Sequence, residues 1–297
     1  MNKVLLIGQN GQVTTYLQRV LGGEHELCIA GRDELDLNEI DQIDSTLQRF
    51  APDLIVNPAA YTAVDQAEDD SDAAYLINRD AVAEIAAFCA RTNTPLIHFS
   101  TDYVFAGDAT DPYLESDSTA PTGVYGRSKL AGEKAILKSG APALILRTAW
   151  VYSNHGKNFY KTMLMLSESR HDISVVGDQV GAPTYAGSIA DATKQLVDSV
   201  LQQGGVTEDQ IGVYHFSCQG QTSWAEFAKA IFVENEVSGM NVNSISTDEY
   251  PTPAKRPSYS VLNLDKLKRT FGIALPHWGT ALAHCASETC SSRASAG

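Results

Sequence analysis

The chain has 297 residues, of which 43% are hydrophobic and 20% are charged. This length is sufficient for one large α/β domain, or for a nucleotide-binding half with a smaller second half. The formal net charge of -14 repels polyanions and anionic membrane surfaces, so no nucleic-acid partner is expected. A nucleotide ligand is still allowed, because a helix N-terminus and one or two arginines hold phosphates locally.

The sequence carries no recognisable targeting or membrane segment. Its start, MNKVLLIGQNG, has only a short apolar run before a glycine turn, too short for the core of a signal peptide. No later apolar run approaches the length of a membrane span. The cysteines form no CxxC pair, which favours reduced thiols. We therefore expect a cytoplasmic protein that does not enter a membrane.

Short apolar runs alternate with amphipathic segments through the first half of the chain. The runs are KVLLIG, ELCIAG, DLIVNPAA, PLIHFSTD and ALILRTAW. Between them, apolar residues recur three and four positions apart, as in helices that lie on the faces of a sheet. This alternation predicts a Rossmann-type, doubly wound parallel sheet over residues 1–150.

Beyond Trp150 the pattern changes to helices mixed with short strands and proline-rich loops. Residues 151–286 are therefore expected to form mainly a smaller α/β substrate-binding domain, with some segments returning to the first sheet. The final stretch, 287–297, is composed of small and polar residues and is expected to be a flexible tail.

The segment VLLIGQNGQVTTYLQRVL predicts a strand, a glycine turn and a helix, the context in which a dinucleotide pyrophosphate binds. Gly8 is expected to make the turn and Gly11 to let backbone amides approach the phosphates. Thr14 stands where the motif has its third glycine, and a β-branched residue there is expected to push the helix slightly outward. Because two glycines are also ordinary punctuation in α/β proteins, the motif needs further context. The candidate contacts of this turn are Gly8, Gln9, Asn10, Gly11, Gln12 and Val13.

Two further segments complete the predicted NAD(P) site. Arg32, which follows the second strand, favours pairing with a 2'-phosphate and therefore NADPH, with NADH as the alternative. Asp36 and Leu37 are expected to flank the adenine. After the third strand come the residues expected beside the nicotinamide ribose, which are Ala59, Ala60, Tyr61 and Thr62.

The segments FSTDYVF and YGRSK indicate the chemistry. Thr101 lies at the predicted carboxyl end of a parallel strand, where open α/β sheets bind ligands, and Tyr125 and Lys129 share one face of a predicted helix. Reduction of a ketone needs a proton donor, and a tyrosine with a pKa of about 10 is a slow one near neutrality. The lysine is expected to lower that pKa and to hold the cofactor ribose with the tyrosine, while Thr101 hydrogen-bonds the carbonyl oxygen. These three are the predicted catalytic residues, and the simpler alternative is a solvated helix face.

From Lys3 to about Trp278 the chain resembles the extended short-chain dehydrogenases/reductases, and within them the dTDP-4-dehydrorhamnose reductases. The resemblance is carried by DLIVNPAAYTAVDQAE, STDYVFAG, VYGRSKLAGEKA, LRTAWVY, NFYKTML, DQVGAPT and YPTPAKRPSYSVLN. It implies NAD(P)H-dependent reduction of dTDP-4-dehydro-beta-L-rhamnose to dTDP-beta-L-rhamnose, the last step of dTDP-L-rhamnose biosynthesis, with Tyr125 as the proton donor. The residues that it implies around the dTDP-sugar are Thr101, Asp102, Tyr103, Trp150 and Arg256.

The family resemblance also raises the question of a metal. Some members hold magnesium between two subunits with glutamates, but Tyr16 and Gly187 occupy two of the matching positions here. A carboxylate site cannot be built from them. We therefore predict an enzyme that needs no metal, either monomeric or forming a homodimer in another way.

Several alternative functions stay open at this stage. A related dehydratase would carry a glutamate where this chain has Tyr103, and an epimerase would retain its cofactor through turnover. A non-catalytic regulatory subunit resembling that of methionine adenosyltransferase would not need an intact catalytic trio. The complete set of Thr101, Tyr125 and Lys129 favours an enzyme, and a reductase of another nucleotide 4-keto sugar is the closest alternative.

Overall fold

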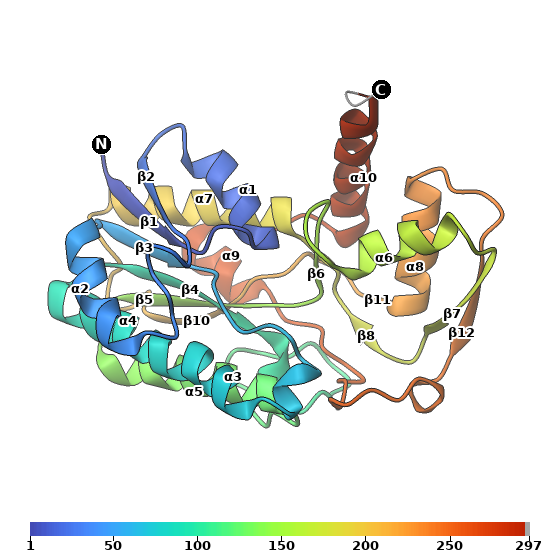
Figure 1. The fold of residues 1–297 in the computed structure, drawn as a ribbon, viewed down its shortest axis with the longest axis horizontal. Helices are drawn as coiled ribbons and strands as arrows, with labels where there is room; N and C mark the ends of the chain where they lie inside the picture. The colour runs from blue at the N-terminus through green and yellow to red at the C-terminus, as the bar shows by residue number, and fades with distance from the viewer. Residues whose placement is uncertain (295–297) are drawn as a thin grey trace.

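The computed structural model describes residues 1–294, in which a parallel sheet flanked by helices carries a smaller lobe at one end (Figure 1). The sheet has six strands in the order β10-β5-β4-β3-β1-β2, and every neighbouring pair is parallel. This architecture confirms the predicted Rossmann-type fold class. The strands are β1 (Lys3–Ile7), β2 (Glu26–Ala30), β3 (Leu54–Asn57), β4 (Leu96–Thr101), β5 (Ala143–Thr148) and β10 (Gly212–His215).

The strands read as continuous apolar runs because both faces of the sheet are buried. Side chains alternate between the two faces along each strand. Val4 and Leu6 pack with helices α1 (Gln12–Leu21) and α7 (Ala186–Gln202). The alternate residues of β1 belong to a second core on the opposite face. That core is closed by α2 (Ile40–Phe50), α4 (Ala81–Thr92) and α5 (Val124–Ser139).

Helix α5, which carries the predicted tyrosine and lysine, lies very close to its neighbour. Helix α3 (Ser71–Tyr75) runs through a π-helical turn (Leu76–Asp80) into α4. A Cβ atom at Gly132 of α5 would lie 2.1 Å from the carbonyl oxygen of Asn78 in that turn. Glycine is therefore required for this approach. None of the helices within residues 1–294 is both long and apolar enough to cross a membrane.

The smaller lobe is built from paired short strands and three helices. Its strands are β6 (Val151–Tyr152) with β9 (Thr184–Tyr185), β7 (Asp172–Val176) with β12 (Asn241–Ile245), and β8 (Val180–Gly181) with β11 (Thr222–Ser223). Its helices are α6 (Phe159–Ser167), α8 (Trp224–Glu234) and α10 (Trp278–Ala294). Phe227 and Ile231 of α8 belong to the same apolar core as Leu6 of the sheet, so the lobe and the sheet share one buried interior.

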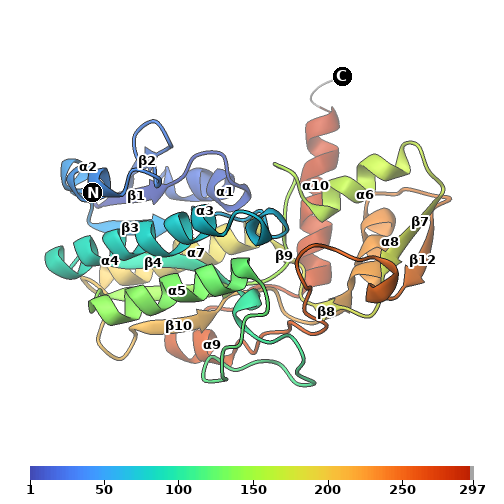
Figure 2. The same ribbon diagram turned by 60° about the horizontal axis from the view of Figure 1, so that its bottom comes forward.

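Packing does not follow chain order beyond residue 150. Helix α7, strand β10 and helix α9 (Asp265–Phe271) come late in the sequence, yet they lie with the sheet (Figure 2). Strand β10 is hydrogen-bonded to β5 at the sheet edge, and α7 packs against α1. The predicted boundary at residue 150 therefore divides the sequence but not the packing, because α7, β10 and α9 lie with the sheet although they follow that residue.

Helix α10 continues to Ala294, through the first residues of the segment expected to be a flexible tail from residue 287, and the flexibility of this segment stays a prediction. Leu282 and Cys285 are buried on one side of this helix. In its next turn, Thr289 donates a hydrogen bond of 2.7 Å to Asn154 of the β6–α6 loop. This contact with a distant loop holds the helix where composition alone suggested fraying. Residues 295–297 of the proposed tail lie outside the described residues.

A buried ion pair fixes α5 to the sheet. Arg147 of β5 donates to both carboxylate oxygens of Glu133, at 2.9 and 2.7 Å. Ser100 of β4 donates a further hydrogen bond of 2.5 Å to the same carboxylate. The side chains of Arg147 and Glu133 are only 4% and 2% exposed, so neither charge can be solvated if the other is removed.

Replacing Glu133 with glutamine is therefore expected to lower the free energy of unfolding by about 3–5 kcal/mol, because Arg147 would become an uncompensated buried charge. Urea unfolding followed by circular dichroism measures this loss. The matched control is Glu226→Gln, which breaks an exposed pair with Lys229 and should cost less than about 0.5 kcal/mol. Equal losses in the two variants would contradict the interpretation.

Candidate active site

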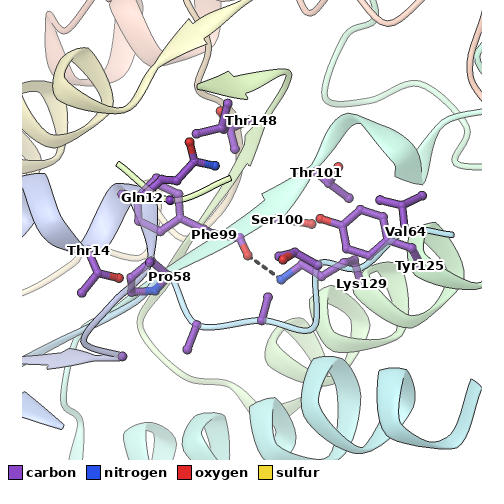
Figure 3. A pocket seen from close by; sticks show the side chains of 18 of the residues that line it. Gln12, Thr14, Pro58, Val64, Phe99, Ser100, Thr101, Tyr125, Lys129 and Thr148 are labelled. Carbon is purple, nitrogen blue, oxygen red and sulfur yellow. Dashed lines mark hydrogen bonds between the residues drawn. The ribbon is translucent and has the colours of Figure 1, made fainter. Parts of the chain in front are cut away.

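A cavity of about 670 Å³ opens at the carboxyl ends of the central strands (Figure 3). Ligands bind at this edge in open parallel sheets. One end of the cavity is lined by the β1–α1 turn, and the other by the end of β4 and the first turns of α5. Trp150 and Lys157, which follow β5 in the chain, complete its wall. The cavity therefore joins the predicted nucleotide turn to the predicted catalytic residues.

The β1–α1 turn has the form that a phosphate group needs. Gly8 has a φ of 101°, a conformation that favours glycine. Gly11 caps α1 without a side-chain hydrogen bond to the first turn, and such backbone N–H groups bind phosphates. Thr14, in place of the third glycine, is buried with its hydroxyl 3.1 Å from the site of a Cβ atom on Gly11. The turn therefore accommodates threonine beneath it, while the expected outward shift of the helix stays a prediction.

The structure brings together most, but not all, of the predicted cofactor contacts. Gln9 contacts Gly31 after β2, whereas Tyr61 packs into a cluster with Ala67 and Ala74. Neither Gln9 nor Tyr61 is among the residues that line the cavity. The predicted contacts that line it are Gly8, Asn10, Gly11, Gln12, Val13, Ala59, Ala60, Thr62, Tyr125 and Lys129.

The three residues predicted near the adenine end lie outside this cavity. Arg32 is exposed, and Leu37 is part of the core under α2. Hydrogen bonds from Asn38, assisted by the charge of Arg32, lower the pKa of Asp36. Their place after β2, next to the glycine turn, is compatible with the adenosine half of a dinucleotide, and their contacts with it stay a prediction.

Thr101, Tyr125 and Lys129 meet at the far end of the cavity (Figure 3). Thr101 ends β4, and its hydroxyl donates to Asp102 at 3.0 Å while accepting from the backbone N–H of Tyr103 at 3.2 Å. It also lies beside the Tyr125 hydroxyl. The rings of Tyr125 and Tyr103 pack edge to face, with centroids 5.6 Å apart. These contacts hold the hydroxyl of Thr101, at the end of β4, next to the hydroxyl of Tyr125, in α5.

The charges of the predicted donor and its lysine are set mainly by burial. Burial raises the pKa of Tyr125, opposed by its hydrogen bond with Thr101. Burial also lowers the pKa of Lys129 to about 8. The Lys129 ammonium donates to the carbonyl of Phe99 at 2.6 Å and lies 3.3 Å from Nε2 of His98. The expected lowering of the tyrosine pKa by the lysine is therefore wrong for this arrangement of protein groups, in which desolvation dominates.

Asp102, Tyr103 and Trp150 line the cavity as predicted for substrate contacts, whereas Arg256 does not. Burial raises the pKa of Asp102 to about 6, which hydrogen bonds oppose. Arg256 instead donates to Asp65 at 2.6 Å and to the Tyr103 hydroxyl at 3.3 Å. Arg256 therefore connects its own proline-rich loop to the loop that follows β3. Its contact with a substrate stays a prediction.

Sequence reasoning missed several residues of the site. Asn57 and His98 were assigned only to apolar strands, although both are fully buried and lie behind Lys129. Periodicity gives no signal for a polar residue inside a buried strand. Lys157 lies in the loop between β6 and α6, where no motif in the sequence singles it out. The other cavity residues that were not predicted are Thr14, Pro58, Val64, Phe99, Ser100, Thr148, Val151 and Gly156.

The two positions expected to lack metal ligands lie close together. Tyr185 donates a hydrogen bond to the hydroxyl of Tyr16 at 2.9 Å, and Tyr16 donates to Glu288 at 3.0 Å. A Cβ atom at Gly187 would lie 2.5 Å from the ring of Tyr185. Neither position therefore offers a carboxylate ligand, and independence from a metal stays a prediction.

Trp150 has an unusual backbone at the cavity wall. Its φ is 47°, which is strained for a bulky residue. Its ring stacks on that of Trp224, with centroids 3.6 Å apart and planes 5° apart. A Cβ atom at Gly181 would lie only 2.4 Å from the Trp150 ring. The conformation of Trp150 is therefore set by α8 and by the absence of a side chain at position 181.

Comparison with known proteins agrees with this geometry. The family model described as the RmlD substrate binding domain matches residues 1–291. The dTDP-4-dehydrorhamnose reductase of Sinorhizobium fredii is 44% identical over 279 residues, covering 93% of this chain and 94% of the relative. The enzyme of that name from Escherichia coli K12 is 41% identical over 284 residues, covering 93% and 94%.

The chain belongs to the RmlD family of dTDP-4-dehydrorhamnose reductases. A solved dTDP-4-dehydrorhamnose reductase from Bacillus anthracis, in complex with NADP, has a TM-score of 0.89 at 35% identity and covers 97% of this chain and 99% of its own. A Brucella ovis UDP-glucose 4-epimerase shares only the fold, at 16% identity with a TM-score of 0.79, covering 97% of this chain and 98% of its own. Membership of the RmlD family confirms the resemblance that the motif segments of the sequence carry.

Replacing Gly181 with alanine is expected to push Trp150 off Trp224 and to cost about 1–3 kcal/mol of stability through overpacking. The expected readouts are loss of the far-ultraviolet exciton signal of the stacked pair and a lower urea midpoint. Gly23→Ala is the matched control, because nothing lies within 4 Å of a Cβ atom there. An unchanged signal in the Gly181 variant would contradict the assigned packing.

Proposed function

We propose that this chain reduces the keto group of dTDP-4-dehydro-beta-L-rhamnose with NADPH to give dTDP-beta-L-rhamnose, the last step of dTDP-L-rhamnose biosynthesis. The observation that carries this proposal is the continuous cavity between the glycine turn and the catalytic end of β4. Relatives named dTDP-4-dehydrorhamnose reductase at 41–44% identity support the substrate.

The chain's own residues handle the proton and the oxygen of the ketone. NADPH, when bound, supplies the hydride. Tyr125 donates its hydroxyl proton to the carbonyl oxygen, and burial keeps that proton in place near neutral pH because it raises the tyrosine pKa. Thr101 donates a hydrogen bond to the same oxygen as negative charge develops there. Lys129 places a positive charge at the cavity floor.

The assignment of NADPH rests on Arg32 and on a relative. Arg32 is exposed after β2, where it is free to pair with a 2'-phosphate. The Bacillus anthracis enzyme was solved with NADP, whereas a more distant structural neighbour was solved with NAD. NADH therefore remains the second candidate cofactor.

Substrate contacts through Asp102, Tyr103, Trp150 and Arg256, a metal-independent reaction, and a monomeric or homodimeric assembly are also part of the proposal. A cytoplasmic location and the absence of a nucleic-acid partner rest on composition and charge. The second candidate function is reduction of another nucleotide 4-keto sugar, because the residues proposed to contact the substrate bear on its keto group and sugar and do not identify its base.

Replacing Tyr125 with phenylalanine is expected to lower kcat by about 10²–10⁴-fold, because the proton donor is lost. NADPH oxidation in the presence of the keto sugar measures the rate, and a fluorescence titration should show that NADPH affinity falls by about tenfold at most, the cost of one hydrogen bond to the ribose. Tyr250→Phe, at an exposed site, is the control and should retain full activity. Normal turnover in the Tyr125 variant would refute the assignment of Tyr125 as the proton donor, whereas no turnover by the wild-type protein would favour the regulatory-subunit alternative.

Replacing Arg32 with alanine is expected to weaken NADPH binding by about tenfold through loss of a charged hydrogen bond, with NADH binding unchanged. Titration with each cofactor measures the two dissociation constants. Arg170→Ala removes an exposed arginine outside the cavity and serves as the charge control. An equal loss for both cofactors would show that Arg32 does not contact the 2'-phosphate.

A further inference from the structure

A chain of buried polar groups lies behind Lys129. Asn57, the last residue of β3, is paired in register with His98 of β4. Nδ2 of Asn57 lies 3.2 Å from Nδ1 of His98, and Nε2 of the same imidazole lies 3.3 Å from the Lys129 ammonium. Asn57 and His98 are 0% exposed and Lys129 is 2% exposed, so these three groups are shielded from bulk solvent.

The orientation of the Asn57 amide decides the tautomer of His98. Its carbonyl oxygen accepts the backbone N–H of Ala59 at 3.2 Å, which leaves its NH₂ group to donate toward His98. Nδ1 of His98 must then carry the lone pair, and the proton of the neutral imidazole must lie on Nε2. Burial lowers the pKa of His98 well below its usual value, so the ring stays neutral.

An Nε2–H group facing Lys129 favours the neutral lysine. If Lys129 is an ammonium, it can only donate, so it and the Nε2–H group are two donors that face each other. If Lys129 is an uncharged amine, its lone pair accepts a hydrogen bond from Nε2–H. The amine still donates to the carbonyl of Phe99. The carboxylate of Glu133 on α5 partly opposes the effect of burial on this lysine, although Glu133 is itself paired with Arg147 of β5. Tyr125, also on α5, lines the same cavity as Lys129.

We propose that His98, held in its Nε2–H form by Asn57, is a positioning residue that prepares Lys129 to return to Tyr125 the proton lost in each turnover. This inference rests on the proposed reduction. The Tyr125 O–H bond breaks as the keto oxygen takes the proton. The phenolate then takes a proton from Lys129 through a hydroxyl or water in the shared cavity. The resulting amine accepts the hydrogen bond from His98 until solvent reprotonates it.

The tautomer is tested first, in the protein without substrate. Nitrogen-15 NMR of histidine-labelled protein reports which ring nitrogen carries the proton, and the signal lost in His98→Asn identifies His98. The expected result is a neutral ring protonated at Nε2 in the wild type. Asn57→Asp should move the proton to Nδ1, because a carboxylate accepts from both Ala59 and the imidazole. Protonation at Nδ1 in the wild type would overturn the proposal.

The consequence for Lys129 is tested by pH dependence. The wild-type rate should fall above about pH 8 as the lysine loses its proton. In Asn57→Asp the alkaline limb of kcat should move up by about one pH unit, since the imidazole then presents a lone pair that stabilises the ammonium. The control is Asn57→Asp in the His98→Asn background, where only the direct attraction of the new carboxylate is left and the limb should move by clearly less. A shift of equal size without His98 would overturn the relay.

A third measurement separates this proposal from the assignment of the reaction. The pH dependence of NADPH binding, followed by quenching of tryptophan fluorescence, should show the same shift in Asn57→Asp. If no nucleotide sugar were reduced, the proposed function would fail while the tautomer and binding results could still be read. Thermal unfolding of each variant tests whether the fold is retained. Asparagine is chosen to replace His98 because its amide can still form a hydrogen bond with Asn57.

Discussion

The cavity wall formed by α5 depends on two buried polar side chains, Glu133 and Lys129, which dock this helix against β4 and β5. Glu133 meets Arg147 and Ser100, and one turn earlier Lys129 meets the carbonyl of Phe99. Buried polar and charged groups are stable only when their hydrogen-bond partners are in good geometry, so such contacts allow the helix very few positions. Tyr125, a further turn toward the N-terminus, is thereby directed to the end of β4, where Thr101 lies.

This docking explains why a polar site exists at the end of an apolar sheet. The strands are buried on both faces, so a polar residue within them needs a partner from the neighbouring helix or strand. Asn57, His98 and Ser100 find such partners on α5 or on the adjacent strand. The polar layer continues directly into the cavity, where Thr101 lies beside the hydroxyl of Tyr125.

The smaller lobe contributes a wall whose shape depends on strain and stacking. Trp150 adopts a left-handed backbone conformation and is supported by Trp224 of α8 and by Gly181. Such strain persists only where the surroundings over-determine the conformation. At another edge, Arg256 and Asp65 join the loop of the lobe to the sheet. The lobe is therefore attached to the sheet by side chains adjacent to the cavity as well as by the shared apolar core.

Local patterns in the sequence predicted a large part of the fold and of the site. The alternation of apolar runs indicated β1 to β5 and the helices between them, because burial on both faces imposes continuous apolar strands. The glycine turn and the four-residue spacing of Tyr125 and Lys129 indicated a cofactor and a proton donor, since each depends on backbone geometry within a few residues.

Only the tertiary structure decided which distant groups meet. The return of β10 to the sheet edge, the pairing of Arg256 with Asp65, and the contact that continues α10 past residue 287 join segments far apart in the chain. Likewise, the contacts of Lys129 with Phe99 and His98 depend on how closely α5 packs on β4. Periodicity reports which face of an element is buried, but the partner of a buried polar atom is set by packing in three dimensions.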